Sequence, residues 1–154
     1  MKYLIFMNTI LHFLLSFVFV DIIFGNAKNY ILPILLFSVI VDLDHIPYLL
    51  KVKKDLIKKR FGAESRSIFH ELVGLFVFSL IFCISFFFLP LNLIRIISFC
   101  LVIHISIDFL FGTTRPFYPF SNKKIFLGLF SKRFIYLMDL FLTLILLIFV
   151  IGYV

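Results

Sequence analysis

Five apolar stretches, each long enough to cross a lipid bilayer as a helix, constrain this chain more than any other feature. A helix needs roughly 20 mostly apolar residues to span the ~30 Å hydrocarbon core. Hydrophobic residues make up 63% of the 154 residues and charged residues 15%, whereas soluble domains average about 45–50% and 25%. A soluble chain of this length could not bury so much apolar surface. We therefore exclude a soluble enzyme, an extracellular disulfide scaffold and a disordered tail, and expect an all-α, polytopic membrane bundle.

The expected bundle is a single membrane-embedded domain that covers residues 1–154. A short polar turn from Gly25 to Asn29 and the helix breaker Pro90 separate neighbouring stretches. The first stretch is longer than the roughly 7–15 apolar residues of a signal peptide, so we expect it to be retained. The expected spans cover about 3–24, 30–50, 68–89, 91–112 and 134–154, with longer polar connections at 51–66 and 113–133.

The basic residues predict how the bundle is oriented. The chain carries a formal net charge of +7, and 13 of its 15 Lys and Arg residues lie at Lys2 or in the connections 51–66 and 113–133. Five crossings place these three regions on one side, and the positive-inside rule makes that side cytoplasmic, which predicts an N-in, C-out topology. Setting the topology and attracting anionic headgroups account for the basic loops, so nucleic-acid binding is not needed to explain them. We therefore expect membrane lipids as partners and no nucleic acid.

Ionisable side chains inside the expected spans are costly in lipid, so each requires a partner. Every histidine of the chain belongs to this set, which consists of His12, Asp42, Asp44, His45, His70, Glu71, His104, Asp108 and Asp139. At a rise of 1.5 Å per residue, five of them lie about 3–14 Å from the cytoplasmic face. These five come from four different spans and are His12, Asp44, His70, His104 and Asp108. Their common depth predicts one cluster near the cytosol.

The residue types of this cluster favour a divalent metal ion. His104 and Asp108 are four residues apart and share one face of a helix. Imidazole and carboxylate groups without thiolates suit a catalytic ion better than a closed structural zinc site. Cys83 and Cys100 lie in apolar runs and are expected to be inert thiols. A single transmembrane histidine is more often hydrogen-bonded to a neighbouring helix, so the prediction of a metal site depends on the five residues together.

The order of these residues resembles that of a known family. A histidine in the first span is followed by Asp42-Leu43-Asp44-His45, by Arg66-Ser67-Ile68-Phe69-His70 and by His104-Ile105-Ser106-Ile107-Asp108. This order resembles the YdjM family of LexA-regulated inner-membrane proteins, regarded as metal-dependent hydrolases and distantly similar to the zinc-dependent phospholipase C and nuclease group. Where that family has His, Thr and Ser in its third motif, this chain has Ser65, Phe69 and Glu71.

The resemblance implies a ligand set and a cofactor. It implies that Asp44, His70, His104 and Asp108 bind a first ion, and that His12 binds a neighbouring one that Asp108 bridges. The implied cofactor is one or two divalent ions, with zinc as the first choice.

From this chemistry we expect a hydrolase that acts on a phosphodiester or lipid headgroup at the cytoplasmic face. Asp42 or Asp44 would serve as base for the attacking water, and Arg66 and Arg115 would bind the phosphate. Two alternatives stay open. Transmembrane Asp and His residues also line proton, ion and metal transport pathways, although the outer half of this chain is almost entirely apolar. The same groups could instead only join helices in a non-enzymatic scaffold.

Overall fold

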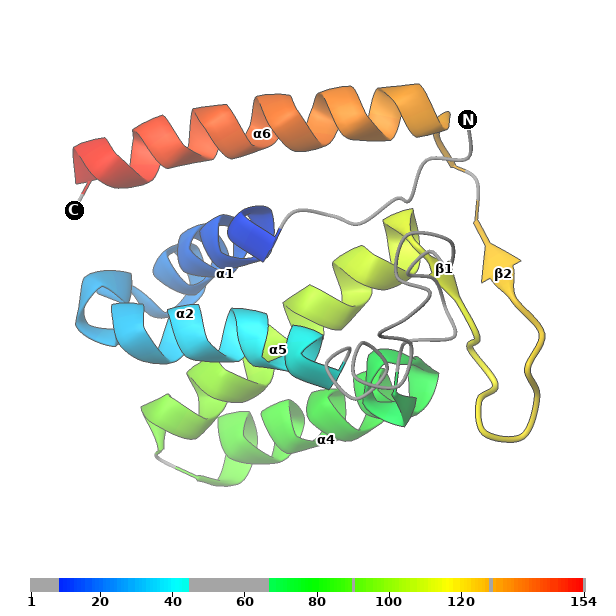
Figure 1. Cartoon of the computed structure of the whole chain (residues 1–154). Helices are drawn as coiled ribbons and strands as arrows, with labels where there is room; N and C mark the ends of the chain where they lie inside the picture. The colour runs from blue at the N-terminus through cyan, green and yellow to red at the C-terminus, as the bar shows by residue number, and fades with distance from the viewer. Residues whose placement is uncertain (1–8, 45–66, 90, 128, 154) are drawn as a thin grey trace.

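The computed structural model describes residues 9–44, 67–89, 91–127 and 129–153, apart from the side chains of Asp44 and Lys132. The described chain is all-α in its main architecture, as expected (Figure 1). Long apolar runs favour such helices, which are apolar around most of their circumference. The α-helices are α1 (Thr9–Phe24), α2 (Ile31–Val39), α4 (Leu72–Phe88), α5 (Asn92–Phe111) and α6 (Lys132–Tyr153).

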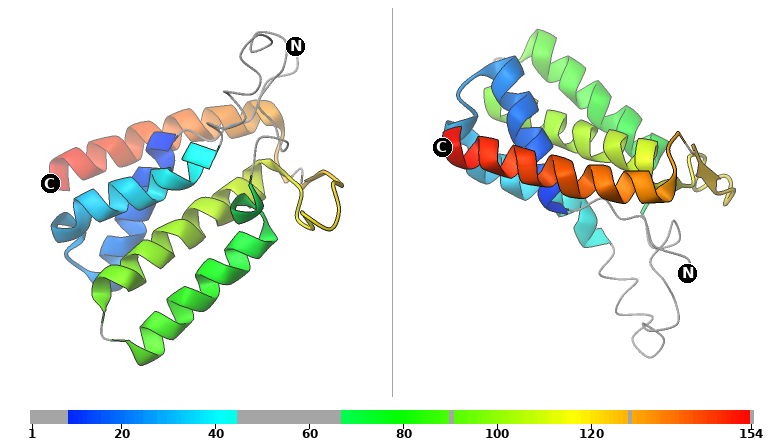
Figure 2. Two further views of the ribbon diagram at one scale, coloured as in Figure 1. Left: turned by 60° about the horizontal axis from the view of Figure 1, so that its bottom comes forward. Right: turned by 90° about the horizontal axis from the view of Figure 1, so that it is seen from above.

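Helix α5 is the centre of the packing. Helices α1, α2 and α4 each pack against it, and it lies between α2 and α4 in the left view of Figure 2. Its buried Ile96 and Cys100 join Leu14 and Phe17 of α1 and Ile34 of α2 in the main hydrophobic core. Helix α6 runs along α1 and buries only a narrow stripe, formed by Ile135, Thr143 and Val150.

The second and third expected spans are less regular than predicted. Helix α2 ends at Val39 and continues as the 3₁₀-helix η2 (Ile40–Asp44). The third begins with the 3₁₀-helix η4 (Ile68–His70), and α4 follows after an extended Glu71. The Ser67 hydroxyl accepts a hydrogen bond from the Phe69 N–H and caps η4. Residues 45–50 of the second expected span, and the connection 51–66, lie outside the described residues.

Two described helices are long and apolar enough to cross a membrane, Asn92–Phe111 and Arg133–Tyr153. The apolar helices Thr9–Phe24 and Leu72–Phe88 are shorter. The crossing count of five and the N-in, C-out orientation stay predictions.

The connection 113–133 contains a small antiparallel ribbon that the all-α expectation did not include. Strand β1 (Thr113–Thr114) pairs with β2 (Ile125–Phe126), with Thr113 opposite Phe126. Pairing the two ends of this connection satisfies backbone groups that would otherwise need water. The ribbon lies beside the C-terminal end of α5 and the beginning of α4 (Figure 1).

Candidate metal centre

Imidazole and carboxylate groups from four segments meet at the end of the bundle nearest the ribbon. His12 lies near the start of α1, Asp42 in η2, His70 in η4, and His104 and Asp108 in the C-terminal half of α5. All three histidines and Asp108 are buried, and Asp42 is half-buried. We call these five residues the His/Asp cluster.

Asp42, His70 and His104 form one group within the cluster. His104 Nε2 lies 3.3 Å from His70 Nε2 and 3.4 Å from Asp42 Oδ1. His70 Nε2 lies 3.8 Å from the same Asp42 oxygen. Two donor atoms that bind one zinc ion tetrahedrally, at about 2.0–2.1 Å, are roughly 3.4 Å apart. The three atoms are therefore spaced as ligands of a single small ion would be.

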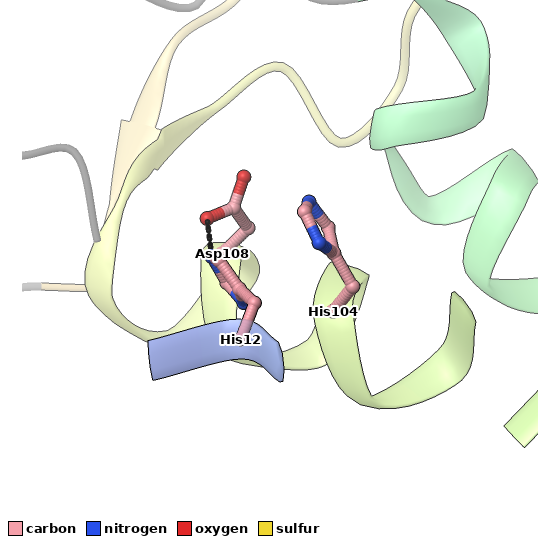
Figure 3. A group of neighbouring side chains, drawn as sticks. All are labelled: His12, His104 and Asp108. Atoms are coloured by element: carbon pink, nitrogen blue, oxygen red, sulfur yellow. Dashed lines mark ion pairs between the residues drawn. The ribbon is translucent and has the colours of Figure 1, made fainter. Parts of the chain in front are cut away.

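His12, His104 and Asp108 form a second group that shares His104 with the first. His12 Nε2 lies 3.4 Å from Asp108 Oδ1, the pair joined by the dashed line in Figure 3. The His12 and His104 rings stack, with centroids 4.1 Å apart. The other oxygen of Asp108, Oδ2, lies 3.7 Å from His70 Nε2. One carboxylate thus faces a histidine of each group.

A backbone contact fixes how His104 faces the cluster. His104 Nδ1 lies 2.6 Å from the carbonyl oxygen of Ser38 at the end of α2. A carbonyl oxygen can only accept, so Nδ1 carries the proton, and in the neutral ring Nε2 presents its lone pair to Asp42 and His70. Metal-binding histidines commonly hold their other nitrogen in this way.

The donor set fits a divalent metal ion. The cluster offers nitrogen and oxygen donors, which such ions accept. Two imidazole Nε2 atoms 3.3 Å apart need a shared proton or a cation between them, since two lone pairs would repel. In the second group, the buried Nδ1 of His12 has no hydrogen-bond partner among the described residues.

Sequence comparison places the chain in a family. A family model described as YdjM inner membrane protein matches residues 7–153. The chain belongs to the YdjM inner membrane protein family. It is therefore a membrane protein, and the family resemblance based on its motifs is confirmed. No curated protein and no solved structure matches the chain.

In this YdjM family member, four of the five predicted ligands lie together, namely His12, His70, His104 and Asp108. The side chain of the fifth, Asp44, lies outside the described residues, as do His45 and Arg66. Asp42, which the sequence analysis considered as a base, lies among the potential ligands, and the Thr9 hydroxyl donates a hydrogen bond to its Oδ2. The pairing of Thr9 with Asp42 has no sequence signal, since 33 residues separate them.

Arg115, a predicted phosphate-binding residue, lies in a buried pair with Glu71. The backbone N–H of Arg115 donates to Glu71 Oε2 at 2.8 Å, and its Nε lies 3.8 Å from Oε1. Its guanidinium carbon lies 4.2 Å from the centre of the Tyr118 ring. This pair, which has no signal in the sequence, attaches the segment after α5 directly beside His70.

Proposed function

We propose that the protein is a metal-dependent hydrolase that cleaves a phosphodiester bond of a lipid headgroup at the cytoplasmic face of the membrane. The observation that carries this proposal is the spacing of Asp42, His70 and His104, whose three donor atoms lie 3.3–3.8 Å apart. Membership in an inner membrane protein family is compatible with a lipid substrate. In this proposal the chain crosses the membrane several times, with its N-terminus and basic connections in the cytoplasm.

Each residue of the cluster has a role in the proposed reaction. His12, Asp42, His70, His104 and Asp108, together with Asp44, would hold one or two divalent ions, with zinc preferred. Such an ion would supply an acidified water and polarise a phosphoryl oxygen. Asp42 or Asp44 would accept a proton from the attacking water. The Thr9 hydroxyl orients Asp42 through its Oδ2, and the Ser38 carbonyl orients His104.

The two arginines of the proposal would bind the substrate phosphate. A guanidinium group matches two phosphate oxygens at once. Contacts with Glu71 and Tyr118 hold the Arg115 side chain in place. We propose that Arg66 completes the phosphate site and stabilises the transition state.

Metal content and hydrolysis together test the proposal. The purified wild-type protein in detergent should contain transition metal, measured by mass spectrometry, and should lose it to a chelator. It should release headgroups from phospholipid micelles only when the metal is bound. His104→Ala should reduce both metal and hydrolysis to background, because it removes a donor from both groups. His70→Ala and Asp108→Ala, which each remove a donor from one group, should clearly reduce both. Asp21→Asn is the matched control, because Asp21 lies at the other end of α1, where it accepts a hydrogen bond from the Ala27 N–H.

The alternatives give different results. A wild-type protein free of metal would contradict the proposal and favour the scaffold, in which the same contacts only join helices. Metal or proton flux across liposomes, without hydrolysis of any phosphodiester, would favour transport.

A further inference from the structure

An apolar groove runs along the side of the bundle next to the His/Asp cluster. It has a volume of about 240 Å³. The end of α2 forms one side of the groove and α4 forms the other, and both helices pack against α5, which forms the floor. Apart from Ser67, its lining residues are apolar and consist of Phe37, Ile40, Val41, Phe69, Phe78 and Leu101.

Three lining residues of the groove are neighbours of cluster residues along the chain. Val41 directly precedes Asp42, and Phe69 directly precedes His70. Leu101 lies three residues before His104 on α5, so the two side chains are neighbours on one helix face. A molecule in this groove would therefore have one end beside the candidate ligands.

The groove is open at the outside of the bundle, where two of its apolar lining residues are exposed. Phe69 is 53% exposed and Ile40 is 43% exposed. The Phe69 and Phe78 rings lie 6.3 Å apart and together form the wall on the α4 side. A second apolar depression, between Phe134 and Leu144, is lined by residues of α6 alone.

We infer that this groove binds one acyl chain of the lipid whose headgroup the cluster hydrolyses, an inference that rests on the proposed function. The volume is below the roughly 300–1,000 Å³ of pockets that enclose a drug-sized ligand, so the groove fits a segment of one chain and not a whole lipid. The groove would place the headgroup of a bound lipid at the cluster and would make acylated substrates preferred over soluble phosphodiesters.

A photocrosslinking experiment tests the occupant directly. The full-length protein is prepared with the photoreactive residue p-benzoylphenylalanine in place of Phe78, and as a control in place of Phe76, which is 70% exposed on the same helix and does not line the groove. Phosphatidylglycerol is titrated into detergent micelles that hold the protein. A lipid adduct that saturates at position 78, but rises only in proportion to lipid at position 76, is expected.

Other adducts would overturn the inference. Crosslinking from position 78 to residues 45–66 of the same chain, or to a second copy, would assign the groove a different occupant. Equal, non-saturating lipid adducts at both positions would show that the groove contacts lipid no differently from the rest of the helix surface.

A pair of truncations provides a second measurement if the photoreactive variants do not fold. Phe78→Ala should weaken retention of phosphatidylglycerol in native mass spectra by about fivefold, as expected for the loss of one aromatic contact, and Phe76→Ala should not. Unchanged retention in Phe78→Ala would contradict the inference.

The hydrolysis assay separates the two proposals. With Phe78→Ala, which removes part of the groove wall on the α4 side, lipid cleavage should fall while cleavage of bis(p-nitrophenyl) phosphate is maintained. Saturable lipid capture without cleavage of either substrate by the wild type would contradict the hydrolase alone. Cleavage of both substrates without saturable capture would contradict the groove alone.

Discussion

His104 connects the parts of the candidate site more closely than any other described residue. It belongs to both metal-compatible groups, stacks on His12, and is fixed by the Ser38 carbonyl. The sequence predicted His104 and Asp108 because residues four apart share a helix face. It named Asp44 as a ligand and Asp42 only as a possible base. The sequence did not reveal η2, which turns about 120° per residue and not the 100° of an α-helix and so changes the direction of each side chain.

Removing His104 should lower the amount of bound metal more than removing His12. His104→Ala takes a donor from both groups, whereas His12→Ala leaves Asp42, His70 and His104 in place. We expect background metal in the first variant and partial metal in the second, measured by mass spectrometry on protein of equal purity and matched melting temperature. Equal metal loss in both variants would show that the two groups do not bind independently.

The pair of Glu71 and Arg115 should contribute strongly to stability. Both side chains are buried, and removing one partner of a buried pair leaves the other charge uncompensated, at a cost of about 3–5 kcal/mol. Glu71→Ala should therefore lower the melting temperature in detergent clearly, and Glu71→Gln, which keeps an acceptor for the Arg115 N–H, should lower it less. An unchanged melting temperature in Glu71→Ala would contradict this role.

The irregular segments η2 and η4 supply two of the cluster's side chains, and they are also the elements that the sequence predicted least well. Apolar runs predicted the positions of the five described α-helices, since a long apolar run has few other solutions in lipid. The ends of α2 and α4 depend on local contacts instead, such as the Ser67 cap of η4. Apolar length alone carries no information about such contacts.

Gly74 is expected to fix the position of η4. A Cβ atom at Gly74 would overlap the backbone carbonyl of Phe69, so α4 and η4 pack together only without a side chain there. Gly74→Ala should destabilise the protein by about 1–3 kcal/mol and displace His70, which lowers metal affinity. Gly152→Ala is the matched control, since nothing lies within 4 Å of a Cβ at that position.

Melting curves and metal titrations of these two variants measure the effect. A Gly74→Ala protein with unaltered stability and metal affinity would show that η4 is placed by other contacts.

The orientation of the whole chain follows from its basic residues and can be tested by fusion. Since 13 of 15 Lys and Arg residues fall on one predicted side, the C-terminus should be outside. Alkaline phosphatase fused there should be active, and the same enzyme fused within residues 113–133 should be inactive. The reverse pattern would place the His/Asp cluster near the outer face and contradict a cytoplasmic substrate.

The spread of the donors along the chain has a consequence for assembly. The His/Asp cluster takes its members from α1, η2, η4 and α5, so no early folding unit could bind an ion with full strength. An ion that binds only the completed arrangement stabilises it by mass action. Metal binding would then be a late step of biogenesis. In a chain that has inserted into the membrane without metal, the helices would pack less stably and would be more accessible to quality-control proteases.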